Sequence, residues 1–211
     1  MGAKIDPPDW LAYHTAVDLR FSGIKCEDSR DLAFEALGET AVDAIAQPLE
    51  GRRKSLLVAD MESTIIENEM LDELADEVGI RDQIAEITAR AMNGELDFDG
   101  AINERVALLA GLNAGAIERT KKSIRIMPGA KELVATMRTN DAYCALVSGG
   151  FSSYTADIRD QLGFNFHQAN QLEIADGKLT GQVIEPILGR NAKKERLLAL
   201  CEAQNISIKA S

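Results

Sequence analysis

Short runs of apolar residues, each ended by polar or turn-forming residues, mark the candidate strands of the chain. Ser55–Asp60 and Tyr143–Val147 enclose continuous apolar runs, the pattern of strands that are buried on both faces of a parallel sheet. Residues 170–183 contain the central turn Ala175-Asp176-Gly177, whose chemistry predicts a β-hairpin. We expect a further strand to begin at Ile206-Ser-Ile208.

Helical periodicity fills the segments between these strands. Between the first two strands, apolar residues recur at helical spacing over residues 68–98 and again over residues 100–122. This block is too long for an ordinary crossover, so it predicts an inserted helical cap at about residues 67–125. In the main domain, helices are predicted for residues 130–139, 152–162 and 191–204.

The first 50 residues predict a separate small unit of α+β type. Residues 15–21 alternate like an edge strand, and a helical stretch over residues 27–46 is interrupted at Gly38. One strand and one helix cannot close a core alone, so this unit is expected to be the remnant of an accessory domain. The polar connector at residues 47–54 places the domain boundary between residues 1–50 and 51–211. No residue in the unit indicates its role.

The alternation of buried strands with helices predicts an α/β fold with a parallel sheet. The chain has 211 residues, of which 45% are hydrophobic, enough for one well-buried core and a smaller satellite unit. Its net charge of −11 disfavours binding to nucleic acid or to an anionic membrane. Any site for an anionic ligand must therefore be built locally.

Cysteine usage and hydropathy narrow the class of protein further. Cys26, Cys144 and Cys201 are far apart and odd in number, so they predict neither a disulfide framework nor a zinc site. No secretory leader and no apolar run of membrane-spanning length is visible. We expect a reduced cytoplasmic protein, and the sequence does not indicate its oligomeric state.

Asp60 and Glu62 are the first candidates for chemistry. Asp60 ends a predicted strand, at the edge where parallel α/β sheets bind ligands. A carboxylate there can attack phosphorus, and a second carboxylate two residues later can protonate a leaving group and then activate water. The alternative is that Asp60 only caps the helix that follows.

Ser148-Gly149-Gly150 and Lys193 are candidates for binding an anion. The first segment follows a predicted strand and precedes a helix, where a hydroxyl and free backbone N–H groups make an anion site. Lys193 lies near the start of a predicted helix, a position that the helix dipole disfavours for a cation unless an anion binds there. Glycines in a structural turn and a solvated surface lysine are the alternative explanations.

The order and spacing of these segments resemble the haloacid dehalogenase superfamily of phosphatases, and within it the phosphoserine phosphatases. The resemblance covers roughly three quarters of the chain, from Arg52 onward. The segments that carry it are LVADMEST (57–64), ENEMLDELA (67–75), ITARAMNGELDF (87–98), RVALL (105–109), VSGGF (147–151), ANQL (169–172), GKLTG (177–181) and NAK (191–193). It implies a Rossmann-like core with a parallel sheet and the inserted helical cap.

The resemblance also implies a role for each candidate residue in the hydrolysis of phosphoserine. Asp60 aligns with the nucleophile, whose carboxylate also binds Mg²⁺, and Glu62 with the general acid/base, whose backbone carbonyl is a further metal ligand. The substrate-binding positions implied are Glu69 for the ammonium, Arg105 for the carboxylate, and Ser148, Gly149 and Lys193 for the phosphate. Met92 and Phe98 align with apolar cap positions that shield the site from water.

Two features depart from the family pattern. Glu62 stands where the family usually has Asp, and its extra methylene is expected to slow the reaction, because a misplacement of about 1 Å can cost ~100-fold in rate. The family also continues beyond Ile208 into a strand and a G-D-G-x-N-D loop that carries another metal carboxylate. We therefore expect these 211 residues to be an inactive or weakly active fragment of a longer enzyme.

Two other functions remain open on the sequence alone. One is a phosphatase or phosphotransferase that acts on another small amino-acid-like phosphate. The other is a degenerate, non-catalytic relative that binds a ligand or partner, which Glu62 and the absent loop keep in view. A small-molecule substrate is expected for a phosphoserine phosphatase and for a phosphatase or phosphotransferase of this related kind.

Overall fold

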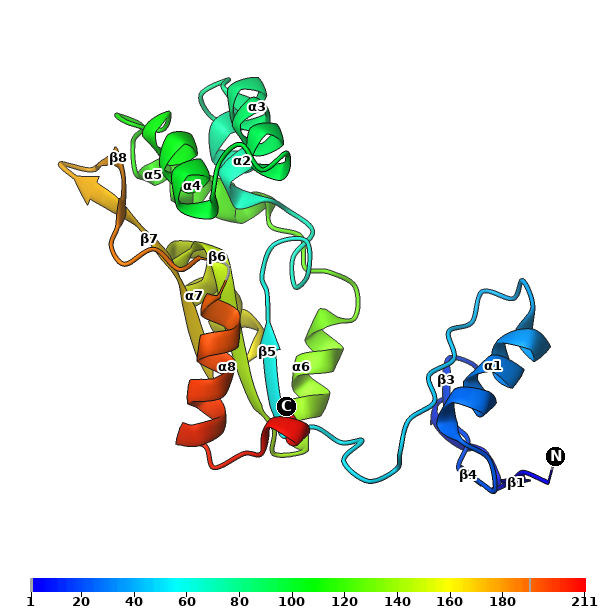
Figure 1. The fold of residues 1–211 in the computed structure, drawn as a ribbon. Helices are drawn as coiled ribbons and strands as arrows, with labels where there is room; N and C mark the ends of the chain where they lie inside the picture. The colour runs from blue at the N-terminus through cyan, green and yellow to red at the C-terminus, as the bar shows by residue number, and fades with distance from the viewer. Residues whose placement is uncertain (1, 190) are drawn as a thin grey trace. The chain divides into compact units, whose positions relative to one another are not determined.

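The computed structural model describes residues 2–189 and 191–211, which form the two compact units drawn in Figure 1. The units are Met1–Arg53 and Lys54–Ser211. Each is described by itself below.

The smaller unit has four short strands and one helix. Strand β1 (Lys4–Ile5) pairs antiparallel with β4 (Phe21–Ser22), and β2 (Asp9–Ala12) pairs antiparallel with β3 (Ala16–Asp18). None of the described side chains in this unit is buried. Two-stranded sheets without a covered face are marginal on their own, which agrees with the expectation that this unit cannot close a core.

The helix of the smaller unit is shorter than predicted. Helix α1 spans Cys26–Leu37 and ends at Gly38, whose φ of 57° lies in the left-handed region. The Gly38 N–H donates to the Phe34 carbonyl, which satisfies one of the last helical acceptors. The prediction that the helix continues to Ala46 is therefore wrong, since this glycine terminates the helix instead of interrupting it.

The larger unit is built on a four-stranded sheet in the order β5-β6-β7-β8. The strands are β5 (Leu56–Ala59), β6 (Tyr143–Phe151), β7 (Phe166–Ala175) and β8 (Lys178–Ile184). The first three are parallel, and β7 and β8 form the predicted hairpin. Its turn is Asp176-Gly177, both of which have positive φ, as this type of tight turn requires.

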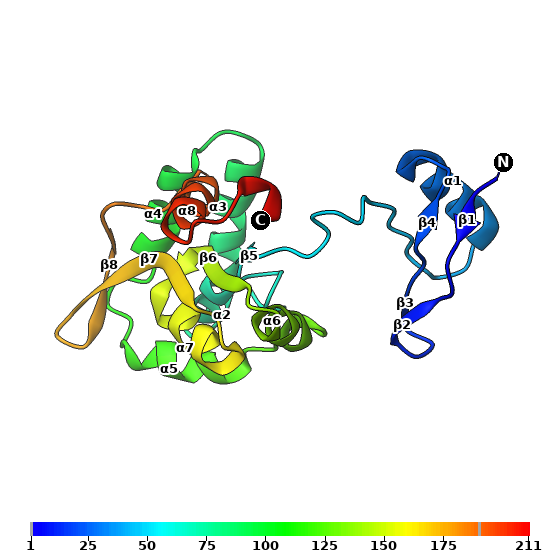
Figure 2. The same cartoon turned by 90° about the horizontal axis from the view of Figure 1, so that it is seen from below.

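Helices cover both faces of this sheet, as Figure 2 shows end-on. Val134 of α6 (Ala130–Thr139) and Tyr154 of α7 (Ser152–Leu162) lie in one apolar cluster with Cys144 and Leu146 of β6. Leu200 of α8 (Ala192–Ala203) joins Ala145 and Val147 in a second cluster on the opposite face. Alternate residues of β6 therefore face opposite layers, and the predicted α/β class is confirmed.

The strand expected at Ile206 does not form. The Ile206 N–H donates back to Cys201, and a 3-10 helix, η2, follows at Ile208–Ala210. The Ser207 hydroxyl accepts a hydrogen bond from the Lys209 N–H. Such a local bond gives the backbone an alternative to a sheet ladder, which explains why this β-like pattern does not extend.

The cap consists of helices α2 (Met70–Asp76), α3 (Arg81–Met92), α4 (Phe98–Ala107) and α5 (Gly115–Thr120), followed by η1 (Lys121–Ser123). Its entry and exit chains pair with each other through a bridge between Ile66 and Ile126.

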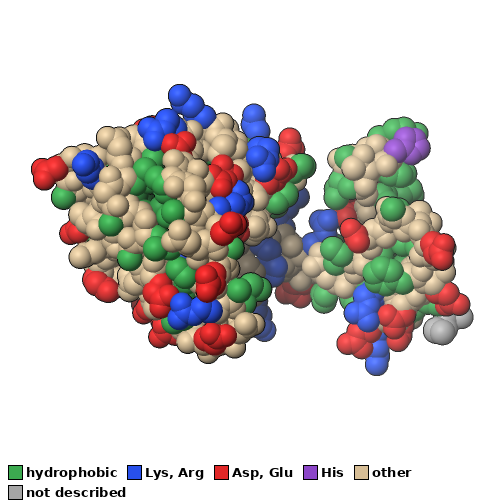
Figure 3. Space-filling model, turned by 90° about the horizontal axis from the view of Figure 1, so that it is seen from above, with side chains coloured by type: hydrophobic (Ala, Val, Ile, Leu, Met, Phe, Trp, Pro, Cys, Tyr) green, Lys and Arg blue, Asp and Glu red, His purple; other side chains and the backbone are tan. Residues whose placement is uncertain are grey.

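On the face drawn in Figure 3, acidic and basic side chains of the larger unit are interspersed. No helix in the described residues is long and apolar enough to cross a membrane.

The cap is also held at a second place, by the β7–β8 hairpin. Gly111 and Leu112 exchange main-chain hydrogen bonds with Leu179, and the Ala114 N–H donates to Gly177. A Cβ atom at Gly181 would lie 3.2 Å from the carbonyl oxygen of Ala107, the last residue of α4, so this helix and β8 approach closely here. The cap is therefore attached to the core both at its connecting chains and at the hairpin.

Candidate active site

The site forms at the carboxyl ends of β5 and β6. Asp60 follows β5 directly, and the parallel register, which pairs Ala59 with Leu146, brings it beside the end of β6. Ser148, Gly149 and Gly150 were predicted to follow the strand and open a helix, but they continue β6 to Phe151. The register with β7 shifts between Val147 and Phe151, so this part of β6 departs from the regular ladder.

Asp60 and Lys193 form an ion pair although 133 positions separate them in the sequence. The Lys193 Nζ lies 2.5 Å from the Asp60 Oδ2 and comes from the first turn of α8. The Asp60 Oδ1 accepts a hydrogen bond of 2.9 Å from the Met61 N–H. Both side chains of the pair are partly exposed, so the carboxylate remains within reach of a ligand.

Glu62 has a carboxyl group suited to hold a proton near neutral pH. Burial of the carboxyl raises its pKa from 4.5 to about 7, and the negative charges of Glu69 and Asp60 add to that rise. A hydrogen bond of 2.9 Å from the Met70 N–H to the Glu62 Oε1 opposes it, as does the charge of Arg105. Both the protonated and the ionised form of this carboxyl group are therefore populated near pH 7.

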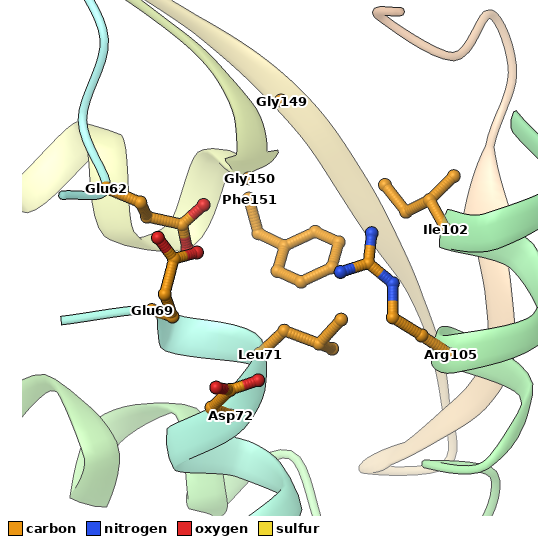
Figure 4. A pocket seen from close by; sticks show the side chains of 9 residues that line it. All are labelled: Glu62, Glu69, Leu71, Asp72, Ile102, Arg105, Gly149, Gly150 and Phe151. Atoms are coloured by element: carbon orange, nitrogen blue, oxygen red, sulfur yellow. The ribbon is translucent and has the colours of Figure 1, made fainter. Parts of the chain in front are cut away.

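A pocket between the core and the cap brings Glu62, Glu69 and Arg105 together. In Figure 4 the carboxyl groups of Glu62 and Glu69 lie beside each other, and the Arg105 guanidinium lies across the Phe151 ring from them. Burial lowers the pKa of Arg105, and the neighbouring carboxylates, including Asp72, raise it. The pocket therefore offers a negative region and a positive region separated by an aromatic ring.

The two apolar cap residues differ in their placement. Phe98, at the start of α4, lies over the end of β6, because a Cβ at Gly149 would be 3.0 Å from its Cζ. Met92 ends α3, and 84% of its surface is exposed. The shielding role that the resemblance implies is therefore compatible with the position of Phe98, whereas Met92 contributes none in this conformation.

Two residues that support the site were not predicted. The Ser63 hydroxyl donates a hydrogen bond of 2.7 Å to the Glu69 Oε1. Asn170, which is 2% exposed, donates from Nδ2 to the Gly149 carbonyl at 2.8 Å and accepts at Oδ1 from the Leu188 N–H at 2.7 Å. Each residue lies in a segment that carries the family resemblance: Ser63 is in LVADMEST (57–64), and Asn170 is in ANQL (169–172). That membership was the signal that could have identified them.

Replacing Asn170 with Ala is expected to lower the free energy of unfolding by about 1–3 kcal/mol, because it leaves two partly buried backbone groups, the Gly149 carbonyl and the Leu188 N–H, without this partner. Urea denaturation followed by circular dichroism measures the change. Gln171→Ala is the matched control, since Gln171 is the exposed neighbour on the same strand and its loss is expected to cost less than about 0.5 kcal/mol. Equal stabilities of the two variants would contradict the bracing role of Asn170.

Comparison with known proteins bears on the family of the chain. The family model described as haloacid dehalogenase-like hydrolase matches residues 57–211. A phosphoserine phosphatase of Streptomyces coelicolor is 41% identical over 201 residues, which cover 93% of this chain and 49% of the relative. The chain thus spans about half the length of this relative.

Solved structures give the same result for the fold. A structure described as a phospho-aspartyl intermediate analogue of phosphoserine phosphatase superposes with a TM-score of 0.69 at 36% identity, covering 74% of this chain and 75% of that one. A hydrolase of the same superfamily from Salmonella enterica serovar Typhi superposes with a TM-score of 0.83 at 26% identity, covering 97% and 71%. The chain belongs to the haloacid dehalogenase-like hydrolase family.

Proposed function

We propose that the protein hydrolyses O-phospho-L-serine to L-serine and phosphate through an aspartyl-phosphate intermediate at Asp60, with Mg²⁺ as its cofactor. The observation that carries this proposal is the Asp60–Lys193 pair beside a pocket that holds Glu62, Glu69 and Arg105. The reaction would complete the biosynthesis of serine. Relatives that carry the name phosphoserine phosphatase support the same assignment.

In the first half of the reaction, Asp60 is the nucleophile. One of its carboxylate oxygens bonds to phosphorus while the bond from phosphorus to the serine oxygen breaks. Lys193, 2.5 Å from the Asp60 carboxylate, lies where it neutralises charge on the transferring phosphoryl group. The Ser148 hydroxyl and the backbone around Gly149 are the proposed partners of the phosphoryl oxygens.

Glu62 handles the protons of both steps. In its protonated form it gives a proton to the departing serine oxygen, and the resulting carboxylate then takes a proton from the attacking water. That water displaces the Asp60 carboxylate from phosphorus and releases phosphate. The raised pKa of Glu62, about 7, supports this double role because both protonation states are accessible near neutral pH.

Glu69 and Arg105 are the proposed recognition groups for the amino-acid part of the substrate. Phosphoserine carries an ammonium and a carboxylate beside its phosphate. The separation of Glu69 from Arg105 in Figure 4 offers one partner for each charge. The Ser63 hydroxyl holds the Glu69 carboxylate in place.

Mg²⁺ fits the donor set at Asp60. This ion is usually bound by only one or two protein carboxylates, with waters and substrate phosphate oxygens as the remaining ligands. Among residues 2–189 and 191–211, no group of three acidic, histidine or cysteine side chains gathers into a fuller cage. Asp60 and the Glu62 carbonyl are the proposed protein ligands, and a bound Mg²⁺ would neutralise phosphoryl charge.

A substrate panel tests the proposal and its main alternative. With Mg²⁺, phosphate release is expected to be fastest from O-phosphoserine and at least ~10-fold slower in kcat/KM from phosphoethanolamine, which lacks the carboxylate. Arg105→Ala should lower kcat/KM for O-phosphoserine by about 10–100-fold, the cost of one charge-assisted contact, and leave phosphoethanolamine within ~3-fold. EDTA should stop both reactions.

The panel also has outcomes that contradict the proposal. Faster release from another amino-acid phosphate would assign the site to that substrate. An Arg105→Ala variant that loses the same factor on both substrates would remove Arg105 from carboxylate recognition. Because the sequence predicts at most weak activity for these 211 residues, the panel is run at high protein concentration, and no phosphate release from any member under that condition would exclude the proposed activity for this chain.

A further inference from the structure

Gly150 lies against the carboxyl group of Glu62. A Cβ atom built on Gly150 would stand 2.7 Å from the Glu62 Oε2, 3.0 Å from Cδ and 3.1 Å from Oε1. Carbon and oxygen atoms that are not bonded do not approach this closely, so any side chain at position 150 would displace the carboxyl group.

Conformational freedom does not account for a glycine at this position. Gly150 is part of β6, and it is not among the glycines with positive φ. Its N–H donates to the Ser148 hydroxyl at 3.0 Å, an arrangement open to any residue except proline. The local backbone does not require a glycine at position 150. The close approach of the Glu62 carboxyl does require one.

The Glu62 carboxyl is held by a second contact as well. Its Oε1 accepts the hydrogen bond from the Met70 N–H at the start of α2. Displacing the carboxyl to admit a Cβ at position 150 would change the geometry of this bond. The Met70 N–H and the missing side chain at position 150 thus together set the position of the carboxyl group.

We propose that Gly150 is a positioning residue. By lacking a side chain it leaves a space, called the Glu62 seat below, that holds the carboxyl group of Glu62 and so allows the longer glutamate side chain to serve as the acid/base. A glutamate extends one methylene further than an aspartate, and the missing side chain at position 150 provides room for that length. The catalytic part of this inference rests on the proposed function; the seat itself rests on the geometry.

A double-mutant experiment in the full chain tests the catalytic part. Gly150→Ala should lower kcat for O-phosphoserine by about 100-fold, the effect of a displacement of about 1 Å, with KM within ~3-fold. In the Glu62→Asp background the same Gly150→Ala change should cost less than ~3-fold, because the shorter carboxyl withdraws from position 150. Equal costs in the two backgrounds would overturn the proposal.

Gly149→Ala is the matched control. A Cβ at Gly149 would meet the ring of Phe98 at 3.0 Å and none of the atoms of Glu62. Gly149→Ala should lower kcat by the same factor in the unchanged protein and in the Glu62→Asp background. Rescue of Gly149→Ala by Glu62→Asp would show that the coupling is not specific to the seat, and would also count against the proposal.

The amide resonance of Met70 gives a readout that does not need activity. In ¹H–¹⁵N spectra of the protein without substrate, Gly150→Ala should shift this resonance and speed its hydrogen exchange by about tenfold or more, because the displaced carboxyl distorts the hydrogen bond from Met70 to Glu62. Gly149→Ala should leave it in place. An unchanged Met70 amide in Gly150→Ala would refute the seat, whereas absence of phosphatase activity with a perturbed amide would refute only the proposed function.

Discussion

Replacing Asp60 with Asn is expected to lower kcat for phosphate release by about 10⁴-fold or more, the scale on which loss of a covalent nucleophile acts. The carboxamide is a poor nucleophile, and it also removes the negative charge that pairs with Lys193. Because the two side chains have nearly the same shape, the fold should be retained. Initial rates of phosphate release and circular dichroism measure the two effects.

The matched control makes the same chemical change outside the site. Asp141 is exposed and has a φ of 61°, a conformation that Asn adopts readily. Asp141→Asn should leave kcat within ~2-fold, as for a surface substitution. Acid-quenched reactions should also yield a phosphorylated peptide containing Asp60 from the unchanged protein and none from Asp60→Asn. Comparable rates for Asp60→Asn and the unchanged protein would exclude Asp60 as the nucleophile.

Replacing Glu62 with Gln is expected to lower kcat for O-phosphoserine by about 10²–10⁴-fold, since the amide cannot transfer a proton to the leaving oxygen. A substrate with a good leaving group, such as p-nitrophenyl phosphate, needs little help in the first step. With that substrate the variant should release one equivalent of nitrophenol and then slow, because water is no longer activated. Exposed Glu86 in α3 provides the control variant Glu86→Gln.

The same Glu62→Gln variant has a signature in stability that does not depend on catalysis. The pKa of Glu62 is raised from 4.5 to about 7 in the folded protein, so the folded state holds the proton more tightly than the unfolded state. Its contribution to stability is present in full below pH 4.5 and is lost as the pH rises through about 7. The difference in unfolding free energy between the protein and the variant should follow this window, and a difference that is flat with pH would contradict the burial of the Glu62 carboxyl.

Periodicity predicted the elements whose burial pattern is strong. The apolar runs of β5 and β6, the turn at Asp176-Gly177 and the helical spacing of α6 all correspond to elements in the structure. The errors fall where a local hydrogen bond decides the backbone. Gly38 closes α1 with its own N–H, and Ser207 diverts the chain into η2.

The sequence predicted those site residues that lie in short motifs with recognisable chemistry, but not the contacts between distant positions. Asp60 and Glu62 can be identified from one short motif at a strand end, but the pairing of Asp60 with Lys193 joins positions 133 residues apart. No periodicity indicates that contact, and the resemblance to a family supplied it. Asn170 and Gly150 were missed as supporting residues because their importance lies in backbone groups and empty space, which a sequence does not display.

The attachment of the cap to the β7–β8 hairpin limits the ways in which the cap can move on the core. Lifting the whole cap would break the main-chain hydrogen bonds that join Gly111, Leu112 and Ala114 to the hairpin. Helix α3 is tied to α4 by a different kind of contact, the ion pair between Arg90 and Glu104. The hairpin side of the cap is therefore held by main-chain hydrogen bonds that no side-chain substitution removes, whereas a single substitution at Arg90 or Glu104 abolishes the ion pair between α3 and α4.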